Sequence, residues 1–382
     1  MDRLRAMRKI FRSDRHSAVI LLVAALLGLL LANTIVGPAL LDISHAELGP
    51  LSVSHWISDL LLAVFFFIVA VELKHELTHG QLNTTRKALV PAIAALGGVI
   101  VPAILYLVLA SSDSSLARGW PIPTATDIAF ALGVLALFGR GLPGRLRVFL
   151  LAFAVLDDLV GILFIAVIFT DSVSIPALLG AVACVVAFGL LSRFKNTWPL
   201  LLLLAAATWY LVLLSGVHAT LAGVGLGLAM AGPRGMALAH HLQPWSNGIV
   251  LPLFAFNAAL VVIPAAGSIG PVVLALAIAM PVGKVIGITL GGLLGAWIAR
   301  KHTEQAIRGW DLVTLGITGG IGFTVALLMN QLAFRAVPSA LDQGVLGVLL
   351  GSGISIVVAA AMISWRARVH RRRLGVTAGR PR

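Results

Sequence analysis

Two adjacent aspartates, Asp157 and Asp158, lie near the centre of a long apolar run that covers roughly residues 146–170. An aspartate at the middle of a lipid bilayer costs about 2.5–3.5 kcal/mol on insertion scales, so two neighbouring ones indicate a function. Such a pair binds and releases protons as one coupled unit. Carboxylate oxygens also suit hard cations such as Na⁺ and Li⁺. Competition between a proton and a cation for one site is sufficient for exchange, and a structural ion pair is the alternative.

The expected partner of one carboxylate is Lys284, which lies inside the stretch 270–299 that is otherwise free of charge. Consecutive side chains on a helix point about 100° apart, so Asp157 and Asp158 cannot face the same way. One of them can line a cavity while the other meets a counter-charge. A buried ammonium requires such a counter-charge, and a lysine kept only for packing is the alternative.

A third acid, Asp127, lies beside Thr126 in the run 121–139, which opens with the sequence Pro121-Ile-Pro-Thr-Ala-Thr-Asp. Proline interrupts a helix, and the interruption leaves helix ends inside the membrane. Because N-terminal helix ends carry partial positive charge, Asp127 is expected to neutralise them. Thr126 can offer an oxygen to the cation; alternatively, its hydroxyl bonds to the carbonyl four residues earlier.

Three further residues are candidates for a response to pH. Glu72 and Glu76 form an i, i+4 pair at one end of the run 56–78, and His218 opens the run 217–232. The glutamates are either an acidic mouth that gathers cations or an ordinary charged helix end. Histidine titrates near neutrality, although many isolated histidines serve only packing.

These residues belong to a chain that cannot cover itself with a water-facing surface. Apolar residues make up 59% and charged residues 11% of the 382 residues, with a mean hydropathy of +1.02, whereas soluble domains average about 25% charged. The runs are continuous rather than alternating, which excludes an outer-membrane barrel. Because a span needs about 20 residues, we predict an all-α membrane protein with twelve transmembrane helices. The predicted spans are 17–36, 56–78, 88–110, 121–139, 147–170, 174–192, 197–215, 217–232, 245–266, 270–299, 310–334 and 344–365.

The net charge of +13 has a topological explanation. With the N-terminus in the cytoplasm, all basic residues except Arg118, Arg335 and the buried Lys284 fall on the cytoplasmic side, as the positive-inside rule requires. This distribution predicts an inner-membrane protein of a bacterium with both termini cytoplasmic. It also predicts an attraction to anionic lipids, and it removes the need for a nucleic-acid partner.

A transport domain is expected at residues 17–366, between a basic arm at 1–16 and a basic tail at 367–382. The first apolar run is interpreted as an uncleaved helix because no small-residue cleavage site stands out. An alternating stretch at about 40–54, with Gly49-Pro50 as its turn, predicts a small β-hairpin on the outer side.

Two of the predicted spans, the fourth and the eleventh, have interrupted sequences. The eleventh contains Gly316-Ile-Thr-Gly-Gly-Ile-Gly-Phe-Thr324, whose glycines disrupt a helix as prolines do in the fourth. A membrane tolerates such breaks only where the backbone lines a cavity or is buried in protein. The two spans occupy matching positions in two triplets of opposite sense, which predicts inverted repeats around an ion site. Glycines for tight helix packing are the alternative.

Together these stretches resemble the NhaA family of sodium/proton antiporters over about residues 10–366. The resemblance implies an NhaA-like fold in which the interrupted fourth and eleventh helices cross. It also implies electrogenic exchange of cytoplasmic Na⁺ or Li⁺ for external H⁺, which extrudes sodium and regulates pH. The signature stretches are Ala63-Val-Phe-Phe-Phe67, Glu72-Leu-Lys-His-Glu-Leu77, Thr124-Ala-Thr-Asp-Ile-Ala-Phe-Ala-Leu-Gly-Val-Leu135, Leu156-Asp-Asp-Leu159, Ser215-Gly-Val-His-Ala-Thr-Leu-Ala-Gly223, Gly283-Lys284 and Gly320-Ile-Gly-Phe-Thr324.

The resemblance also implies roles at the ion site. Asp158 would be the principal cation ligand, and Asp157 would be a second acid that exchanges a proton and pairs with Lys284. Asp127 and Lys284 would offset the dipole ends of the broken helices, and Thr126 would lie at the cation site. No cofactor and no protein substrate are implied, and the protein would be a secondary transporter rather than an enzyme.

Regulation and assembly are implied by resemblance in the same way. Glu72, Glu76 and His218 would take part in pH activation, and the outer hairpin would mediate a homodimer. The family often shows a Glu-His-x-x-His-Pro-Trp stretch before its ninth helix, where this chain has Ala239 and Gln243 in place of the acid and the second histidine. That departure concerns the pH response rather than the transport site.

Three other functions use similar residues. An intramembrane aspartyl protease needs two aspartates that converge on one bond, whereas Asp157 and Asp158 diverge from one helix. A passive cation channel needs neither the inverted broken helices nor Lys284. A sodium-coupled symporter of an organic anion on a related fold is the main alternative, and proton-coupled flux separates it from an antiporter.

Overall fold

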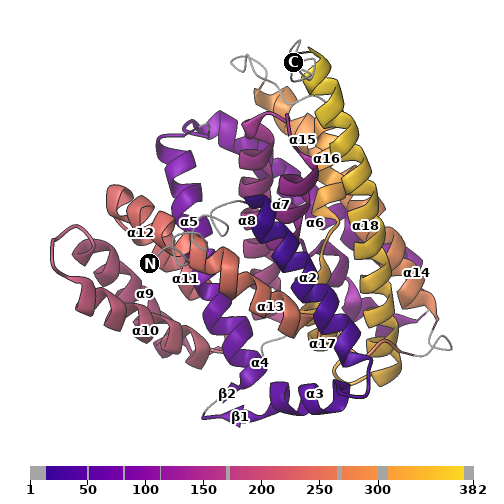
Figure 1. Cartoon of the computed structure of the whole chain (residues 1–382), viewed down its shortest axis with the longest axis horizontal. Coiled ribbons are helices and arrows are strands. Elements are labelled where there is room, and N and C mark those ends of the chain that lie inside the picture. Colours follow the sequence, from indigo (N-terminus) through magenta and orange to yellow (C-terminus); the bar gives the residue numbers. More distant parts are fainter. Residues whose placement is uncertain are drawn as a thin grey trace, which may run out of the picture. The chain divides into compact units, whose positions relative to one another are not determined.

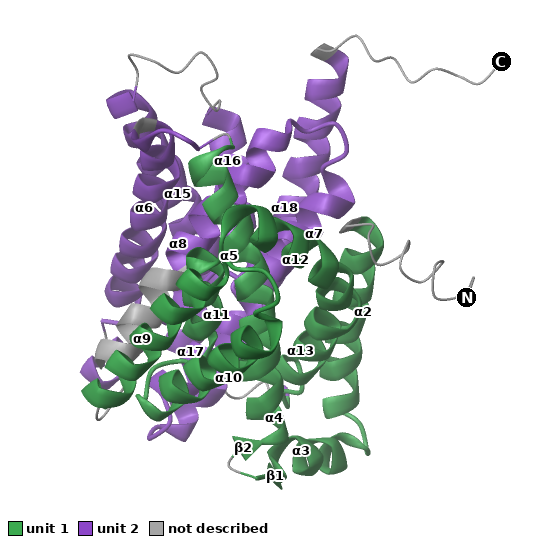
Figure 2. Cartoon of the chain, turned by 90° about the vertical axis from the view of Figure 1, so that its left-hand side faces the viewer, with its two compact units in different colours: residues 1–80, 159–262 green, residues 81–158, 263–382 purple. Residues whose placement is uncertain are grey.

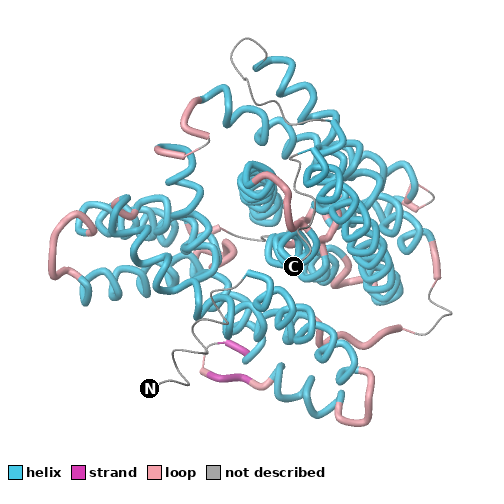
Figure 3. The backbone as a smooth tube through the Cα atoms, turned by 45° about the horizontal axis from the view of Figure 1, so that its top comes forward, coloured by secondary structure: helices cyan, strands magenta, loops and turns pink. Residues whose placement is uncertain are grey.

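The computed structural model describes residues 14–49, 51–80, 82–111, 113–168, 173–264, 269–299 and 309–373, without the side chains of residues 14, 86, 158–168 and 373. The described chain is almost entirely helical (Figure 1, Figure 3), with a single two-stranded sheet in these ranges. Its residues form two compact units, which Figure 2 shows in different colours. Unit 1 comprises residues 1–80 and 159–262, and unit 2 comprises residues 81–158 and 263–382.

Unit 1 contains two groups of elements that are far apart in the sequence. Helix α5 packs on α11 so closely that a Cβ on Gly223 would lie 2.0 Å from the Ala63 carbonyl oxygen. The elements before residue 80 are α2 (Asp14–Ala32), α3 (Gly37–His45), β1 (Glu47–Leu48), β2 (Leu51–Ser52), α4 (Val53–His55), the π-helical turn η1 (Trp56–Leu61) and α5 (Leu62–Thr78). The later elements are α9 (Ile175–Leu191), α10 (Trp198–Leu214), α11 (Thr220–Ala229), α12 (Gly232–Trp245), the π-helical turn η4 (Ser246–Val250) and α13 (Leu251–Ala258).

The hairpin predicted at about 40–54 is smaller in the structure. Its strands β1 and β2 pair antiparallel with Glu47 opposite Ser52, and the turn uses Gly49 at a φ of +70°, which glycine adopts without a steric penalty. The preceding residues form helix α3 rather than a longer strand. Pro38 lies in the first turn of this helix, where its fixed φ suits helix initiation.

Unit 2 also joins two segments, which hold most of the predicted spans three to five and all of spans ten to twelve. Helix α8 (Gly144–Ile168) belongs to unit 2 as far as Asp158. The other elements of the first segment are α6 (Thr85–Leu109), the 3-10 turns η2 (Ser114–Gly119) and η3 (Ile122–Thr124), and α7 (Ile128–Phe138). The second segment contains α14 (Pro271–Ile278), the π-helical turn η6 (Ala279–Gly283), α15 (Lys284–Ala299), α16 (Gly309–Gly319), α17 (Phe323–Ala333) and α18 (Pro338–Arg373).

Glycines bring the backbones of α6 and α15 into contact. A Cβ on Gly97 would lie 2.2 Å from the Gly287 carbonyl oxygen, and a Cβ on Gly287 would lie 2.1 Å from the Gly97 carbonyl oxygen. Small residues at membrane helix interfaces allow this close approach. Lys284 is the first residue of α15, directly after the π-helical turn, so the contact between α6 and α15 fixes the position of Lys284 along α6.

Both spans with interrupted sequences are bent. The 3-10 turns at Ser114–Thr124 meet α7 at an angle of 46°, and α16 meets α17 at 52°. Pro121 and Pro123 lack the backbone N–H that a continuous helix would use. At the second break, a Cβ on Gly322 would lie 2.8 Å from the Ala125 carbonyl oxygen, so glycine lets the two breaks approach each other.

Several described helices are suited to a membrane. Five are long and apolar enough to cross one, and counting each bent pair as one span raises the number to seven. The chain is therefore a multi-pass membrane protein, while the total of twelve spans stays a prediction. The five helices are Arg15–Ala32, Val53–Thr78, Lys87–Leu109, Pro271–Ala299 and Pro338–Arg372.

Candidate ion-exchange site

A single carboxylate, that of Asp127, binds the N-terminal ends of two helices in unit 2. Its Oδ1 accepts a hydrogen bond from the backbone N–H of Phe130 at 3.1 Å, which caps its own helix α7. Its Oδ2 accepts from the backbone N–H of Thr324 at 3.2 Å and from the Thr324 hydroxyl, at the start of α17. Asp127 thus lies where the predicted dipole compensation requires a negative charge.

The C-terminal end of α16 is satisfied by the opposite break. The Thr126 hydroxyl donates to the Gly319 carbonyl oxygen at 2.8 Å, and the backbone N–H of Asp127 donates to the Ile321 carbonyl oxygen at 2.7 Å. The alternative interpretation from the sequence was that this hydroxyl bonds to the carbonyl four residues earlier. The structure instead places its hydrogen bond on α16. Each interrupted segment supplies the hydrogen bonds that the other segment has lost.

Lys284 and Asp157 form an ion pair between fully buried side chains. Lys284 Nζ lies 2.7 Å from Asp157 Oδ2, and it also donates to the carbonyl oxygen of Thr124 at the end of η3. The ammonium lies 5.8 Å from the centroid of the Phe153 ring, a distance that favours a cation–π contact. Asp157 Oδ1 is buried and has no hydrogen-bond partner among the described residues.

Asp158 follows Asp157 in helix α8, but its side chain lies outside the part of the molecule that the structure describes. The described site therefore consists of Asp127, Thr126, Asp157 and Lys284, all in unit 2. It combines two buried carboxylates with one buried ammonium. A proton or cation on the Asp157 carboxylate would weaken its attraction to Lys284, so these groups can couple the binding of the two ions.

Comparison with known proteins decides which family has this arrangement. The sequence matches the family described as Na⁺/H⁺ antiporter 1 over residues 8–363. The chain belongs to this family.

Relatives in this family share most of their length with the chain. A protein of Clavibacter michiganensis subsp. michiganensis named Na(+)/H(+) antiporter NhaA 2 is 54% identical over 384 residues, covering 96% of this chain and 94% of the relative. The Na(+)/H(+) antiporter NhaA of Tropheryma whipplei (strain Twist) is 44% identical over 370 residues, covering 92% and 93%. These values confirm the resemblance to NhaA that the signature stretches indicated.

A solved structure shares the fold. The sodium proton antiporter MjNhaP1 from Methanocaldococcus jannaschii at pH 8 superposes with a TM-score of 0.59 and covers 94% of this chain and 92% of its own. Its sequence is 16% identical, so the likeness concerns the fold alone.

Sequence reasoning did not assign a role to three residues at the breaks. Thr324 donates to Asp127, and Thr124 offers its carbonyl oxygen to Lys284. Ser352 on α18 accepts from the backbone N–H of Phe323 at 3.0 Å. The sequence pointed to such residues only indirectly. A broken helix leaves buried N–H groups without partners, and nearby polar side chains must bond to them.

The residues predicted to respond to pH lie in unit 1, not in unit 2. His218 Nδ1 lies 3.5 Å from Oδ1 of Asp59, an acid that the sequence analysis did not single out although it interrupts the apolar run 56–78. Glu72 and Glu76 are half-buried on α5. The ion site and these residues therefore belong to separate compact units.

Proposed function

We propose that this protein exchanges cytoplasmic Na⁺ or Li⁺ for external H⁺ across a bacterial inner membrane, as a secondary transporter that extrudes sodium and regulates pH. The observation that carries the proposal is the buried Asp157–Lys284 ion pair in the unit where Asp127 caps both interrupted helices. Membership of the Na⁺/H⁺ antiporter family supports the same function. We expect more than one proton per Na⁺, which makes exchange electrogenic.

The exchange follows from competition for buried carboxylates. In the proposed cycle Asp158 is the principal cation ligand, and Asp157 alternates between Lys284 and a proton. A cation that binds the aspartate pair displaces protons because both compete for the same oxygens. Reprotonation from the opposite side releases the cation, and the buried location prevents either ion from passing unexchanged.

The interrupted helices prepare this site in advance. Asp127 already neutralises two N-terminal helix ends, and Lys284 binds the C-terminal carbonyl of η3. Fixed partial charges therefore need no reorganisation when the ion arrives. We propose that the two broken helices cross and that Thr126 presents an oxygen to the bound cation.

The wider architecture is part of the same proposal. We expect twelve spans with both termini in the cytoplasm, a homodimer formed through the hairpin, and anionic lipids around the basic face. Glu72, Glu76 and His218 would tune the response to pH. The contact of His218 with Asp59 supports such a role, because a histidine beside a carboxylate is sensitive to protonation.

Transport by everted vesicles tests the function directly. Vesicles energised by respiration and loaded with a pH-sensitive dye should dequench when NaCl or LiCl is added, but not KCl, between about pH 6 and 9. Asp158→Asn should abolish dequenching while the protein still inserts, and Asp127→Ala should impair it less. Asp42→Asn is the matched control because Asp42 is exposed on α3. If the Asp158→Asn variant exchanges normally, the assignment of the ion site is wrong. If the dye never dequenches with the wild-type protein, a sodium-coupled symporter becomes the better hypothesis.

A further inference from the structure

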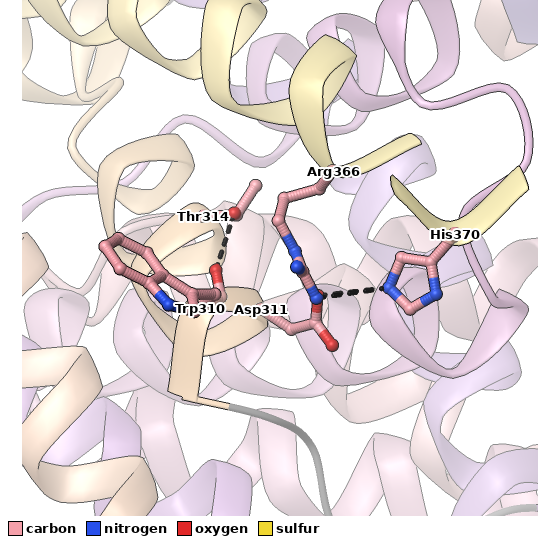
Figure 4. A network of polar contacts seen from close by, with 5 residues as sticks. All are labelled: Trp310, Asp311, Thr314, Arg366 and His370. Atoms are coloured by element: carbon pink, nitrogen blue, oxygen red, sulfur yellow. Dashed lines mark hydrogen bonds and ion pairs between the residues drawn. The ribbon is translucent and has the colours of Figure 1, made fainter. Parts of the chain in front are cut away.

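A second buried cluster of charged residues in unit 2 joins α16 to α18, and Figure 4 shows its side chains directed toward one another. Asp311, Arg366 and His370 are 0%, 3% and 8% exposed. Arg366 donates to Oδ1 of Asp311 from Nε at 2.9 Å and from Nη2 at 2.6 Å. His370 Nε2 lies 3.3 Å from the same oxygen and 3.4 Å from Arg366 Nη2.

Among its three residues the cluster has one acid, Asp311, and two basic groups, Arg366 and His370. The elements packed on α18 are α7, α14, α16, α17 and η6, and their sequences contain no ionisable side chain except Asp311. Oδ2 of Asp311 is buried without a hydrogen-bond partner among the described residues. The C-terminal end of α18 also carries Arg368, Arg371 and Arg372. A Cβ on Gly141, next to Arg140, would lie 2.6 Å from Arg371 Cγ.

His370 cannot bond to both neighbours through the same atom. A guanidinium only donates hydrogen bonds and a carboxylate only accepts them, whereas a neutral imidazole nitrogen does either. A protonated imidazole only donates, so it competes with Arg366 for Asp311 and repels the guanidinium. With neutral His370 the charges of Asp311 and Arg366 sum to zero, and with protonated His370 the three buried residues carry a net charge of one.

Helix α16 connects this cluster to the ion site. Asp311 lies in its first turn, and Gly319 at its last residue accepts the hydrogen bond of the Thr126 hydroxyl. The two positions are eight residues apart, which corresponds to roughly 12 Å of helix. The helix is continuous over this length, so a displacement at Asp311 is transmitted to the Thr126 contact.

We propose that Asp311 and Arg366 position α16, and that protonation of His370 loosens this contact and lowers exchange in acid. The inference rests on the proposed antiport function and adds a regulatory group to it. With His370 neutral, the Asp311 carboxylate is left to Arg366, and α16 holds the Gly319 carbonyl at Thr126.

The first test compares the pH profile of exchange in His370→Gln, His370→Lys and His16→Gln. Glutamine keeps hydrogen-bonding groups without a titratable charge, so the acidic limb should move by roughly half a pH unit or more toward acid. Lysine imitates the protonated state and should reduce exchange several-fold at alkaline pH. His16 is exposed, and its variant should retain the wild-type profile.

The second test does not depend on transport. Purified protein should melt at a lower temperature at about pH 5.5 than at about pH 8.5, and His370→Gln should reduce this difference, whereas His16→Gln should not. Combining Asp311→Asn with His370→Gln should show non-additivity, because the residues act on one contact. The inference is overturned if His370→Gln keeps both the wild-type profile and the wild-type melting difference. A wild type without exchange but with the predicted melting behaviour would refute the proposed function alone.

Discussion

The Asp157–Lys284 ion pair adds little net stability, because the cost of removing both charges from water offsets their attraction. Both side chains are fully buried, and Asp127 is 2% exposed. The Asp127 carboxylate accepts three hydrogen bonds across two helix ends to compensate its burial, whereas Asp157 Oδ1 has no partner among the described residues. We therefore predict that Asp157, rather than Asp127, is the acid that exchanges a proton.

Removal of Lys284 alone should therefore be more damaging than removal of the pair. Lys284→Met leaves Asp157 buried without its counter-charge, and we expect a loss of about 3–5 kcal/mol of stability. The double variant Lys284→Met/Asp157→Leu should recover most of the stability. Exchange should fail in both variants, and thermal unfolding in detergent measures the first effect. Equal melting temperatures for the single and double variants would contradict the assignment.

Competition at a carboxylate also predicts a pH dependence of the apparent affinity. As pH falls, protons occupy the aspartate pair, so the Na⁺ concentration for half-maximal exchange should rise. The rise should approach about tenfold per pH unit if one proton competes with one cation. Initial rates at several Na⁺ concentrations and pH values measure it. A half-saturating concentration independent of pH would exclude a shared site.

At the scale of elements, the close contact of α6 and α15 sets the position of Lys284. Gly97 and Gly287 meet there with backbone atoms in contact, and Lys284 lies one helical turn before Gly287 in α15. The N-terminal ends of the half-helices α7 and α17 depend on the same carboxylate, that of Asp127. Packing on one side and capping on the other thus hold the ion-pair residues and the helix ends together within unit 2.

A larger residue at position 287 should separate these helices. Gly287→Val places side-chain atoms against the Gly97 carbonyl, and overpacking of this kind costs about 1–3 kcal/mol. We expect reduced thermal stability and a several-fold loss of exchange, since Lys284 moves with α15. Gly353→Val is the control, because a Cβ on Gly353 meets no atom within 4 Å. If the two variants behave alike, the α6–α15 contact does not position the site.

At the scale of the whole molecule, each compact unit is built from two distant chain segments. The candidate ion-exchange residues with described side chains all belong to unit 2, and Glu72, Glu76 and His218 belong to unit 1. We therefore predict that substitutions of the candidate ion-exchange residues and of the candidate pH-response residues act separately. Membrane topology is the property at this scale that is most directly measured.

Reporter fusions test the predicted topology. Green fluorescent protein at either terminus should fluoresce, because it folds in the cytoplasm. Alkaline phosphatase at the same ends should be inactive, whereas phosphatase inserted at Gly49, in the turn between β1 and β2, should be active. The reversed pattern would invert the topology, and activity at one terminus only would imply an odd number of spans.

The fold class was predictable because apolar run length and charge distribution are local properties that a membrane selects directly. The bends near Pro121 and Gly320 were also predictable, since proline and glycine weaken helices wherever they occur. The length of the hairpin was overestimated, because alternating polar and apolar residues in a short segment do not distinguish a strand from a helix such as α3. The count of twelve spans exceeds what the described helices establish.

Local sequence patterns therefore indicated a membrane transporter with buried acids, a buried lysine and two broken helices. The energetic cost of placing a charge or a helix break in a membrane depends on the segment that contains it, so the sequence of that segment reveals the feature. Partners separated by long stretches of chain required the tertiary structure. Asp127 binds Thr324 across 197 positions, Lys284 binds Asp157 across 127, and Arg366 binds Asp311 across 55. A hydrogen bond requires a donor–acceptor distance that is correct to within a few tenths of an ångström. Only the packing of α16 against α18, or of one break against the other, sets such distances.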